Sequence, residues 1–327
     1  MADFHALNDI VHYGFTNLAA RLHWSVLLSL TLLSLVAWLL LRNVNHPWRD
    51  RGFFSFLFAR DVWLHPSAKL DYRFVAFDKA ILGLLVVGAG ALLASLSTVA
   101  AEEVADIGDY ILAETLAADP EVLIGYTIAL LVADDFCRYW THRWMHTNPV
   151  LWHFHKVHHS PEVLVPISQM RHHPVNHAIN LARKTVSTAA VTGAFVWLFP
   201  GDLNVVTIAG VNAGRMAFYL SGGNLRHSHV WLSFGRFWSH ILISPAMHQI
   251  HHSKLPRHID RNYGSQFAVW DWMFGSLYVP RAYERLELGI DEDSTRRMRT
   301  IKGLYVEPVK DAWREWRARK HPGPQEA

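Results

Sequence analysis

Five runs of apolar residues alternate with polar and charged segments along this 327-residue chain. The runs cover residues 24–41, 80–100, 121–133, 186–199 and 203–220. The first holds 18 uncharged residues, about the length that a helix needs to cross the roughly 30 Å hydrocarbon core of a bilayer. The pattern predicts an all-α integral-membrane helical bundle of about four or five spans or re-entrant helices.

Composition supports a chain that is partly embedded in a membrane. Hydrophobic residues make up 51% and charged residues only 18% of the sequence, whereas soluble domains are roughly a quarter charged. The mean hydropathy of +0.08 is too low for spans alone, so a polar portion must accompany them. Buried helices of a soluble protein are one alternative. A signal peptide at 24–41 is another, although no charged start or small-residue cleavage site flanks that run.

The charges of the loops predict an orientation. Residues 42–79 contain seven Lys or Arg, whereas residues 101–120 contain six Asp or Glu and no basic residue. The positive-inside rule places 42–79 in the cytoplasm, and counting spans places the later histidine clusters and the C-terminus there too. We found no targeting or endoplasmic-reticulum retrieval signal, which favours a bacterial inner membrane.

Histidine is the unusual feature of the composition. Of 22 histidines, nine lie within 142–177 and seven within 227–258. Cys137 is the single cysteine, so disulfides within the chain and cysteine-built zinc or iron–sulfur sites are excluded. The net charge of +3 is spread along the chain without a dense basic patch, and we therefore expect no nucleic-acid partner.

Eight histidines form three boxes with helical spacing. The boxes are HxxxH at His142 and His146, HxxHH at His155, His158 and His159, and HxxHH at His248, His251 and His252. Residues three and four apart share one face of a helix, so the imidazoles of each box can converge. Eight imidazoles exceed what one ion can bind, which predicts two metal ions. Imidazole ligands suit iron, zinc, copper or nickel.

These boxes closely resemble the fatty acid hydroxylase/sterol desaturase superfamily of membrane-bound histidine-box enzymes. The segments Asp260–Gly264 (DRNYG) and Trp270–Ser276 (WDWMFGS) extend the likeness, which runs from about Asp135 to Pro280. The resemblance implies two non-haem irons and an N-terminal membrane anchor region at 1–120. It also implies a catalytic domain at 121–280 and a charged cytoplasmic tail at 281–327.

The resemblance also assigns individual residues. It implies that the eight box histidines bind metal and that His227 is a ninth ligand. A supporting role, or in some cases a further ligand, is implied for His173, His229, Asp135, Asp271, Asn262 and Tyr263. His153 and His172 are interpreted as surface or stacking histidines.

A dioxygen-dependent oxidoreductase is the function that the resemblance implies. Such an enzyme would hydroxylate or desaturate a lipid, either a fatty acyl chain or a sterol-like molecule. Its electrons would come from a separate ferredoxin or b-type cytochrome with a reductase, because the chain has no dinucleotide fingerprint. A basic surface near Arg143, Lys156, Lys254 and Arg257 is expected to attract either an acidic donor or lipid phosphates.

Several other functions fit the same boxes. A carotenoid or other isoprenoid hydroxylase, or a hydroxylase acting on the acyl chain of an amino-acid lipid, would use similar chemistry. A histidine-rich membrane metal transporter or sensor belongs to a different class. A transporter should carry ligands within its spans, whereas the runs identified above contain almost no histidine.

Overall fold

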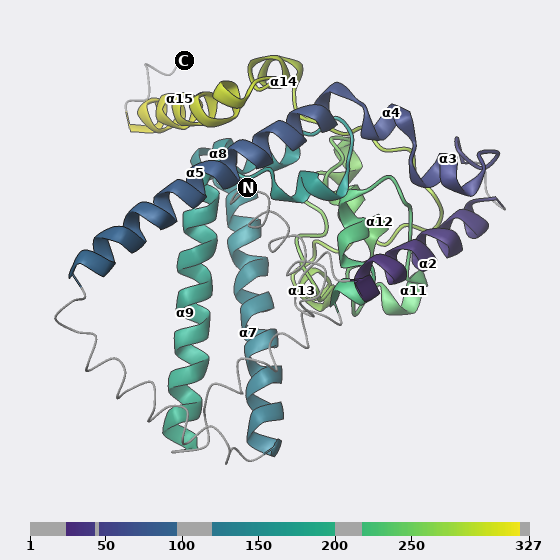
Figure 1. Ribbon diagram of the computed structural model, residues 1–327. Coiled ribbons are helices and arrows are strands. Elements are labelled where there is room, and N and C mark those ends of the chain that lie inside the picture. The colour runs from purple at the N-terminus through teal and green to yellow at the C-terminus, as the bar shows by residue number, and fades with distance from the viewer. Residues whose placement is uncertain (1–23, 43–45, 97–119, 200–217, 321–327) are drawn as a thin grey trace, which may run out of the picture.

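The computed structural model describes residues 24–42, 46–96, 120–199 and 218–320 (Figure 1). Within these ranges the chain is helical, and its strand pairing is limited to an isolated bridge between Leu242 and Phe267. The all-α prediction is therefore confirmed for the described residues. The number of spans and their orientation stay predictions.

The described residues between 24 and 96 contain four helices: α2 (Trp24–Leu41), α3 (Phe53–Leu57), α4 (Arg60–Trp63) and α5 (Pro66–Leu96). Among the described residues, α2 is the one helix that is long and apolar enough to cross a bilayer, judged by length and composition. The run at 80–100 belongs to α5 as far as Leu96. The run at 203–220 lies almost wholly outside the described residues.

Two long helices, α7 (Pro120–Thr147) and α9 (Pro174–Leu198), run side by side and project from the rest of the molecule (Figure 1). Two levels of contact show that they are antiparallel. The Tyr126 hydroxyl lies 2.8 Å from the Thr192 hydroxyl. Further along α7, Asp134 accepts hydrogen bonds from Arg183 and Ser187, which come earlier on α9. The apolar run at 121–133 is thus the first half of a helix whose second half carries His142 and His146.

Three helices next to the histidine boxes begin in the same way, with a capping side chain followed by a proline at the first helical position. They are α8 (Pro149–His159), α9 and α12 (Pro245–His251). The capping residues Asn148, His173 and Ser244 each accept a hydrogen bond from a backbone N–H of the first turn. Proline fits the first helical position because that position needs no N–H donor. The start of each helix, and hence the direction of its histidines, is fixed by local sequence.

The other described helices are short, apart from the last. They are η2 (Pro166–Met170), η3 (Gly223–His227), α11 (Gly235–Trp238), η4 (Pro256–His258), α13 (Val269–Met273), α14 (Glu292–Arg297) and α15 (Ile301–Lys320).

Helix α15 packs along α8 and closes the histidine-bearing end of the molecule (Figure 1). The ammonium of Lys156 on α8 donates to Asp311 at 2.8 Å and to Ser294 at 3.2 Å, and Lys156 is only 4% exposed. Arg297 also donates to Asp311. The expectation that Lys156 contributes to an exposed basic surface is therefore wrong, because a buried carboxylate holds its side chain inside the protein.

Candidate metal centre

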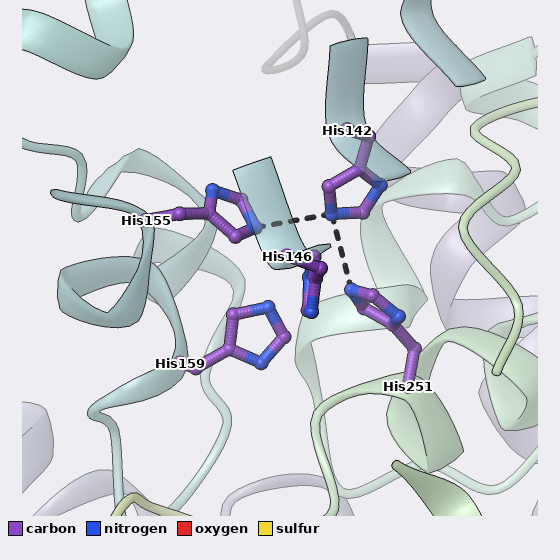
Figure 2. A group of neighbouring side chains, drawn as sticks. All are labelled: His142, His146, His155, His159 and His251. Carbon is purple, nitrogen blue, oxygen red and sulfur yellow. Dashed lines mark hydrogen bonds between the residues drawn. The ribbon is translucent and has the colours of Figure 1, made fainter. Parts of the chain in front are cut away.

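Nine buried or partly buried histidines gather into two groups, and they are the eight box histidines together with His227. The five-histidine group consists of His142, His146, His155, His159 and His251 (Figure 2). The four-histidine group consists of His158, His227, His248 and His252. Within each group, one nitrogen from every ring lies within 4.8 Å of the corresponding nitrogens of the others.

Each HxxHH box is divided between the two groups. On α8, His155 and His159 face the five-histidine group while His158 faces the other. On the α12 box the division is reversed, since His251 alone joins the five-histidine group. Neighbouring residues on a helix point about 100° apart, so one box can serve two adjoining centres. The groups do adjoin, because the ring of His159 stacks on that of His252 with centroids 4.4 Å apart.

A backbone loop orients two rings of the five-histidine group. Nδ1–H of His142 donates to the carbonyl of Tyr263 at 2.7 Å, and Nδ1–H of His251 donates to the carbonyl of Arg261 at 2.8 Å. A carbonyl can only accept, so Nδ1 carries the proton and Nε2 keeps its lone pair. Nε2 of His142 lies 3.1 Å from Nε2 of both His155 and His251, as the dashed lines in Figure 2 show.

Asn262 gives this loop its shape. Its φ of 57° lies in the left-handed region, which asparagine tolerates better than most residues. Its side-chain amide donates to the carbonyls of Met247 and Tyr278, and its side-chain oxygen accepts from the N–H of Tyr278. The loop is thereby tied to α12, with the carbonyls on either side of Asn262 presented to two histidines.

Asp271 holds the same loop from behind. Its carboxylate accepts from the N–H groups of Tyr263 at 2.8 Å and Gly264 at 2.7 Å, and from the hydroxyl of Ser276 at 2.6 Å. A Cβ at Gly264 would approach the Asp271 carboxylate to 2.7 Å, so the position requires glycine. Burial raises the pKa of Asp271 to about 6. Asp271 thus reaches His142 through the Tyr263 backbone.

Burial lowers the pKa of all eight box histidines. Desolvation is the largest cause of the lowered pKa, and the charge of neighbouring imidazoles lowers the pKa further at most positions. The pKa falls to about 3 at His155 and to about 4 at His251. These rings are therefore neutral near pH 7, the form in which imidazole binds a metal ion.

The residues present fit metal ions. In the described part of the chain, the buried Nε2 atoms of His146 and His159 have no hydrogen-bond partner. An unsatisfied buried nitrogen destabilises a fold by about 1–3 kcal/mol. The Nε2 atoms of His142 and His251 also lie 3.1 Å apart with their lone pairs facing one another, which is unfavourable unless a cation lies between them. Two all-imidazole donor sets suit borderline metals such as iron or zinc.

Three other residues singled out by the sequence lie outside both groups. His173 caps α9, and its Nε2–H donates to the carbonyl of Tyr305 on α15 at 3.0 Å. His229 donates to the carbonyl of Phe56 at 2.7 Å. The carboxylate of Asp135 accepts from the backbone of Gln266 and Phe267 and from the Trp270 indole. All three connect the segments that surround the histidines.

Asn176 is a residue of this region that the sequence did not single out. Its side-chain oxygen lies 3.4 Å from Nδ1 of His155, and its amide donates to Nδ1 of His172 at 2.7 Å. His172 in turn stacks on His158 with centroids 4.2 Å apart, which agrees with its interpretation as a stacking histidine. Asn176 follows His172 by four residues at the start of α9, and this helical spacing was the available signal.

A pocket of about 400 Å³ connects the surface with the histidines. His146, His159, His251 and His252 form its inner part, and Trp152 and Ile290 are among its walls. The exposed residues Lys254, Asp260 and Asp291 also line it. The pocket gives small molecules access to the five-histidine group.

Comparisons with known proteins agree with the histidine pattern. Residues 127–276 match the family described as "Fatty acid hydroxylase". An alkylglycerol monooxygenase of Danio rerio is 32% identical over 144 residues, which is 44% of this chain and 28% of the relative. An ornithine lipid hydroxylase of Rhizobium tropici is 27% identical over 52% of this chain and 45% of the relative. A lathosterol oxidase of Rattus norvegicus is 26% identical over 50% of this chain and 48% of the relative.

The chain spans less than half the length of each of these three relatives. No solved structure matches it. The matched segment contains all three histidine boxes together with the loop and aspartate that support them.

Proposed function

We propose that this chain, which belongs to the fatty acid hydroxylase and sterol desaturase superfamily, is an integral-membrane, non-haem di-iron oxygenase acting on a lipid. One observation carries the proposal: nine histidines from α7, α8, η3 and the α12 box converge as two adjoining groups. When bound there, two irons would supply activation of dioxygen for hydroxylation or desaturation at an unactivated C–H bond. The electrons would come from a separate donor.

The protein's own residues would position and shield this chemistry. The Asn262 loop fixes the tautomers of His142 and His251, so that both present Nε2 to an ion. The four-histidine group is buried, which excludes bulk water from that side. Trp152 lies against the five-histidine group, its ring 5.1 Å from that of His146 and 5.4 Å from that of His159, and gives the pocket an apolar wall.

A membrane location is supported by apolar side chains that the fold leaves exposed. On α2, α7 and α9 they include Leu28, Leu32, Ile124, Ile128, Leu181, Val186 and Trp197. Large exposed apolar surfaces of this kind mark contact with lipid or another protein. We place the histidine groups on the cytoplasmic side of the membrane from the charges of the loops.

The relatives indicate the substrate class. They are named for action on an alkylglycerol, an ornithine lipid and a sterol, which share a long apolar body and a small polar part. We therefore propose a lipid of this general form as substrate. A metal transporter is disfavoured, because the histidines of α7 and α9 lie at one end of this helix pair: His142 and His146 near the end of α7, and His177 in the first turn of α9.

Iron content tests the proposal directly. Full-length protein expressed with iron-57 and purified in detergent should contain about two irons per chain, coupled and reducible by Mössbauer spectroscopy. His251→Ala should lose iron and turnover. His153→Ala is the matched control, because His153 lies on α8 outside both groups and should leave both properties unchanged. One tightly bound zinc and no iron, after anaerobic reconstitution, would overturn the di-iron assignment.

Lipid profiling tests the reaction. Membranes of cells that express the protein should contain a lipid that is heavier by one oxygen atom, or lighter by two hydrogen atoms, than in cells without it. An unchanged lipid profile in the presence of iron-loaded protein and a competent donor would overturn the proposed activity.

A further inference from the structure

The pocket beside the five-histidine group has an uneven distribution of charge. Its outer part carries the carboxylates of Asp260 and Asp291 and the ammonium of Lys254. The side chain of Asp260 is 56% exposed, that of His146 is 8% exposed, and Oδ1 of Asp260 lies 4.0 Å from Nδ1 of His146. A cation held by Asp260 would therefore be next to the imidazoles of the five-histidine group.

The inner part of the pocket independently favours binding of a cation. His146 and His159 both line it, and their buried Nε2 atoms have no partner within the described residues. Neutral imidazole nitrogens with free lone pairs bind metal cations and repel anions. An ion that enters the pocket would thus meet carboxylate oxygens at the mouth, which bind metals loosely. It would then meet imidazole nitrogens further in.

The two groups differ in their access to this path. Three members of the five-histidine group line the pocket, whereas His252 is the one member of the four-histidine group that does. All members of the four-histidine group are buried. An ion that uses the pocket reaches the five-histidine group first and the four-histidine group by passing His252.

We propose that this pocket is the loading route for divalent transition-metal ions, with Asp260 and Asp291 as the capture site and with the five-histidine group filled before the four-histidine group. The proposal rests on the proposed function insofar as the histidines bind metal. It adds a role for two carboxylates that belong to neither histidine group, and it makes the two metal centres kinetically unequal.

Cobalt uptake tests the route without substrate, dioxygen or turnover. Metal-free full-length protein in detergent is mixed with Co²⁺ in a stopped-flow instrument, and the visible absorption of bound cobalt is followed. Two phases are expected, with the faster one from the five-histidine group. His248→Ala removes a ligand from the four-histidine group only, so it should reduce the slow phase and leave the fast one.

Charge variants of the mouth give the decisive comparison. Asp260→Asn and Asp291→Asn should each slow the fast phase by about five-fold at low salt, because each removes attraction for a doubly charged ion. Asparagine suits both positions, since it tolerates the φ of 59° at Asp260 and can replace Asp291 as the cap of α14. Lys254→Gln removes the opposing charge and should accelerate uptake.

Glu292→Gln is the matched control. Glu292 follows Asp291 directly but lines a different pocket, so its neutralisation should leave the rate unchanged. Equal uptake rates in wild type, both Asp variants and Lys254→Gln would overturn the loading route while leaving the metal centre intact. An effect of Glu292→Gln as large as those of the Asp variants would overturn it as well. Absence of any cobalt binding would instead overturn the proposed function.

Discussion

Asn262 offers the sharpest test of how the five-histidine group is built. Its side chain forms hydrogen bonds with Met247 and Tyr278, and the carbonyls of the residues on either side of it, Arg261 and Tyr263, orient His251 and His142. Substitution of Asn262 should therefore weaken metal binding without removing a ligand. Two variants separate the contributions of the side chain: Asn262→Gly removes the amide but keeps the left-handed backbone, and Asn262→Ala also strains it.

The magnitude follows from the hydrogen bonds. The Asn262 side chain makes three, with Met247 and Tyr278, and each is worth about 1 kcal/mol net. Asn262→Gly should thus destabilise the fold by about 3 kcal/mol, and Asn262→Ala by about 1 kcal/mol more, the penalty for a side chain in the left-handed region. Loss of such an orienting contact typically lowers metal affinity by about 10–100-fold.

Cobalt titration of the metal-free protein provides the assay, with thermal unfolding in detergent measured alongside. The affinity of the five-histidine group should fall by about 10-fold or more. The four-histidine group should change less, because His142 and His251, the two rings that donate to this loop, both belong to the five-histidine group. The reasoning would be refuted if both variants bound cobalt at both groups as tightly as wild type, or if Asn262→Gly were less stable than Asn262→Ala.

Three further predictions concern other parts of the molecule. His158→Ala should remove one metal and abolish turnover, yet leave membrane insertion unchanged; retained activity would contradict its role. His229 has its pKa lowered from 6.5 to about 4 by burial, so the stability it contributes is complete above pH 6.5 and is lost as the pH falls towards 4. His229 alone should account for about 2 kcal/mol of the loss at pH 5, and His229→Gln should remove that part of the pH dependence in thermal unfolding. Lys156→Met should destabilise the fold by about 3 kcal/mol, because Asp311 then keeps only its arginine partners; exposed Lys302→Met is the control.

The histidine spacing allowed much of the candidate centre to be predicted from the sequence. The pattern HxxxH followed by two HxxHH boxes selected eight residues, and the resemblance to a known family added His227. All nine lie in the two groups that the structure brings together. The clustering of these side chains could be predicted because the spacing of residues on one helix face is a local property, fixed within one or two turns by the geometry of the helix.

Properties that depend on contacts between distant segments could not be predicted in this way. Lys156 lies among the box histidines, and its sequence context predicts a surface cation. In the fold, helix α15 places Asp311, which is 155 residues later in the chain, against its ammonium group. His229 sits two residues from His227, yet its ring faces Phe56. Asp271 follows the family pattern, but only the fold shows that it acts on the backbone of Tyr263. In each case the partner comes from a segment whose position the local sequence does not specify.

The opposite use of the two HxxHH boxes explains why the groups contain five and four histidines. On α8 the i and i+4 histidines face the group that also receives two from α7, whereas on the α12 box the corresponding pair faces the group of His227. If the α12 box divided as α8 does, one group would hold six imidazoles and the other three. An ion that accepts about six ligands would then be saturated in one centre and poorly held in the other. The observed division gives neither group six imidazoles, so an ion that accepts about six ligands would keep at least one position open in either group.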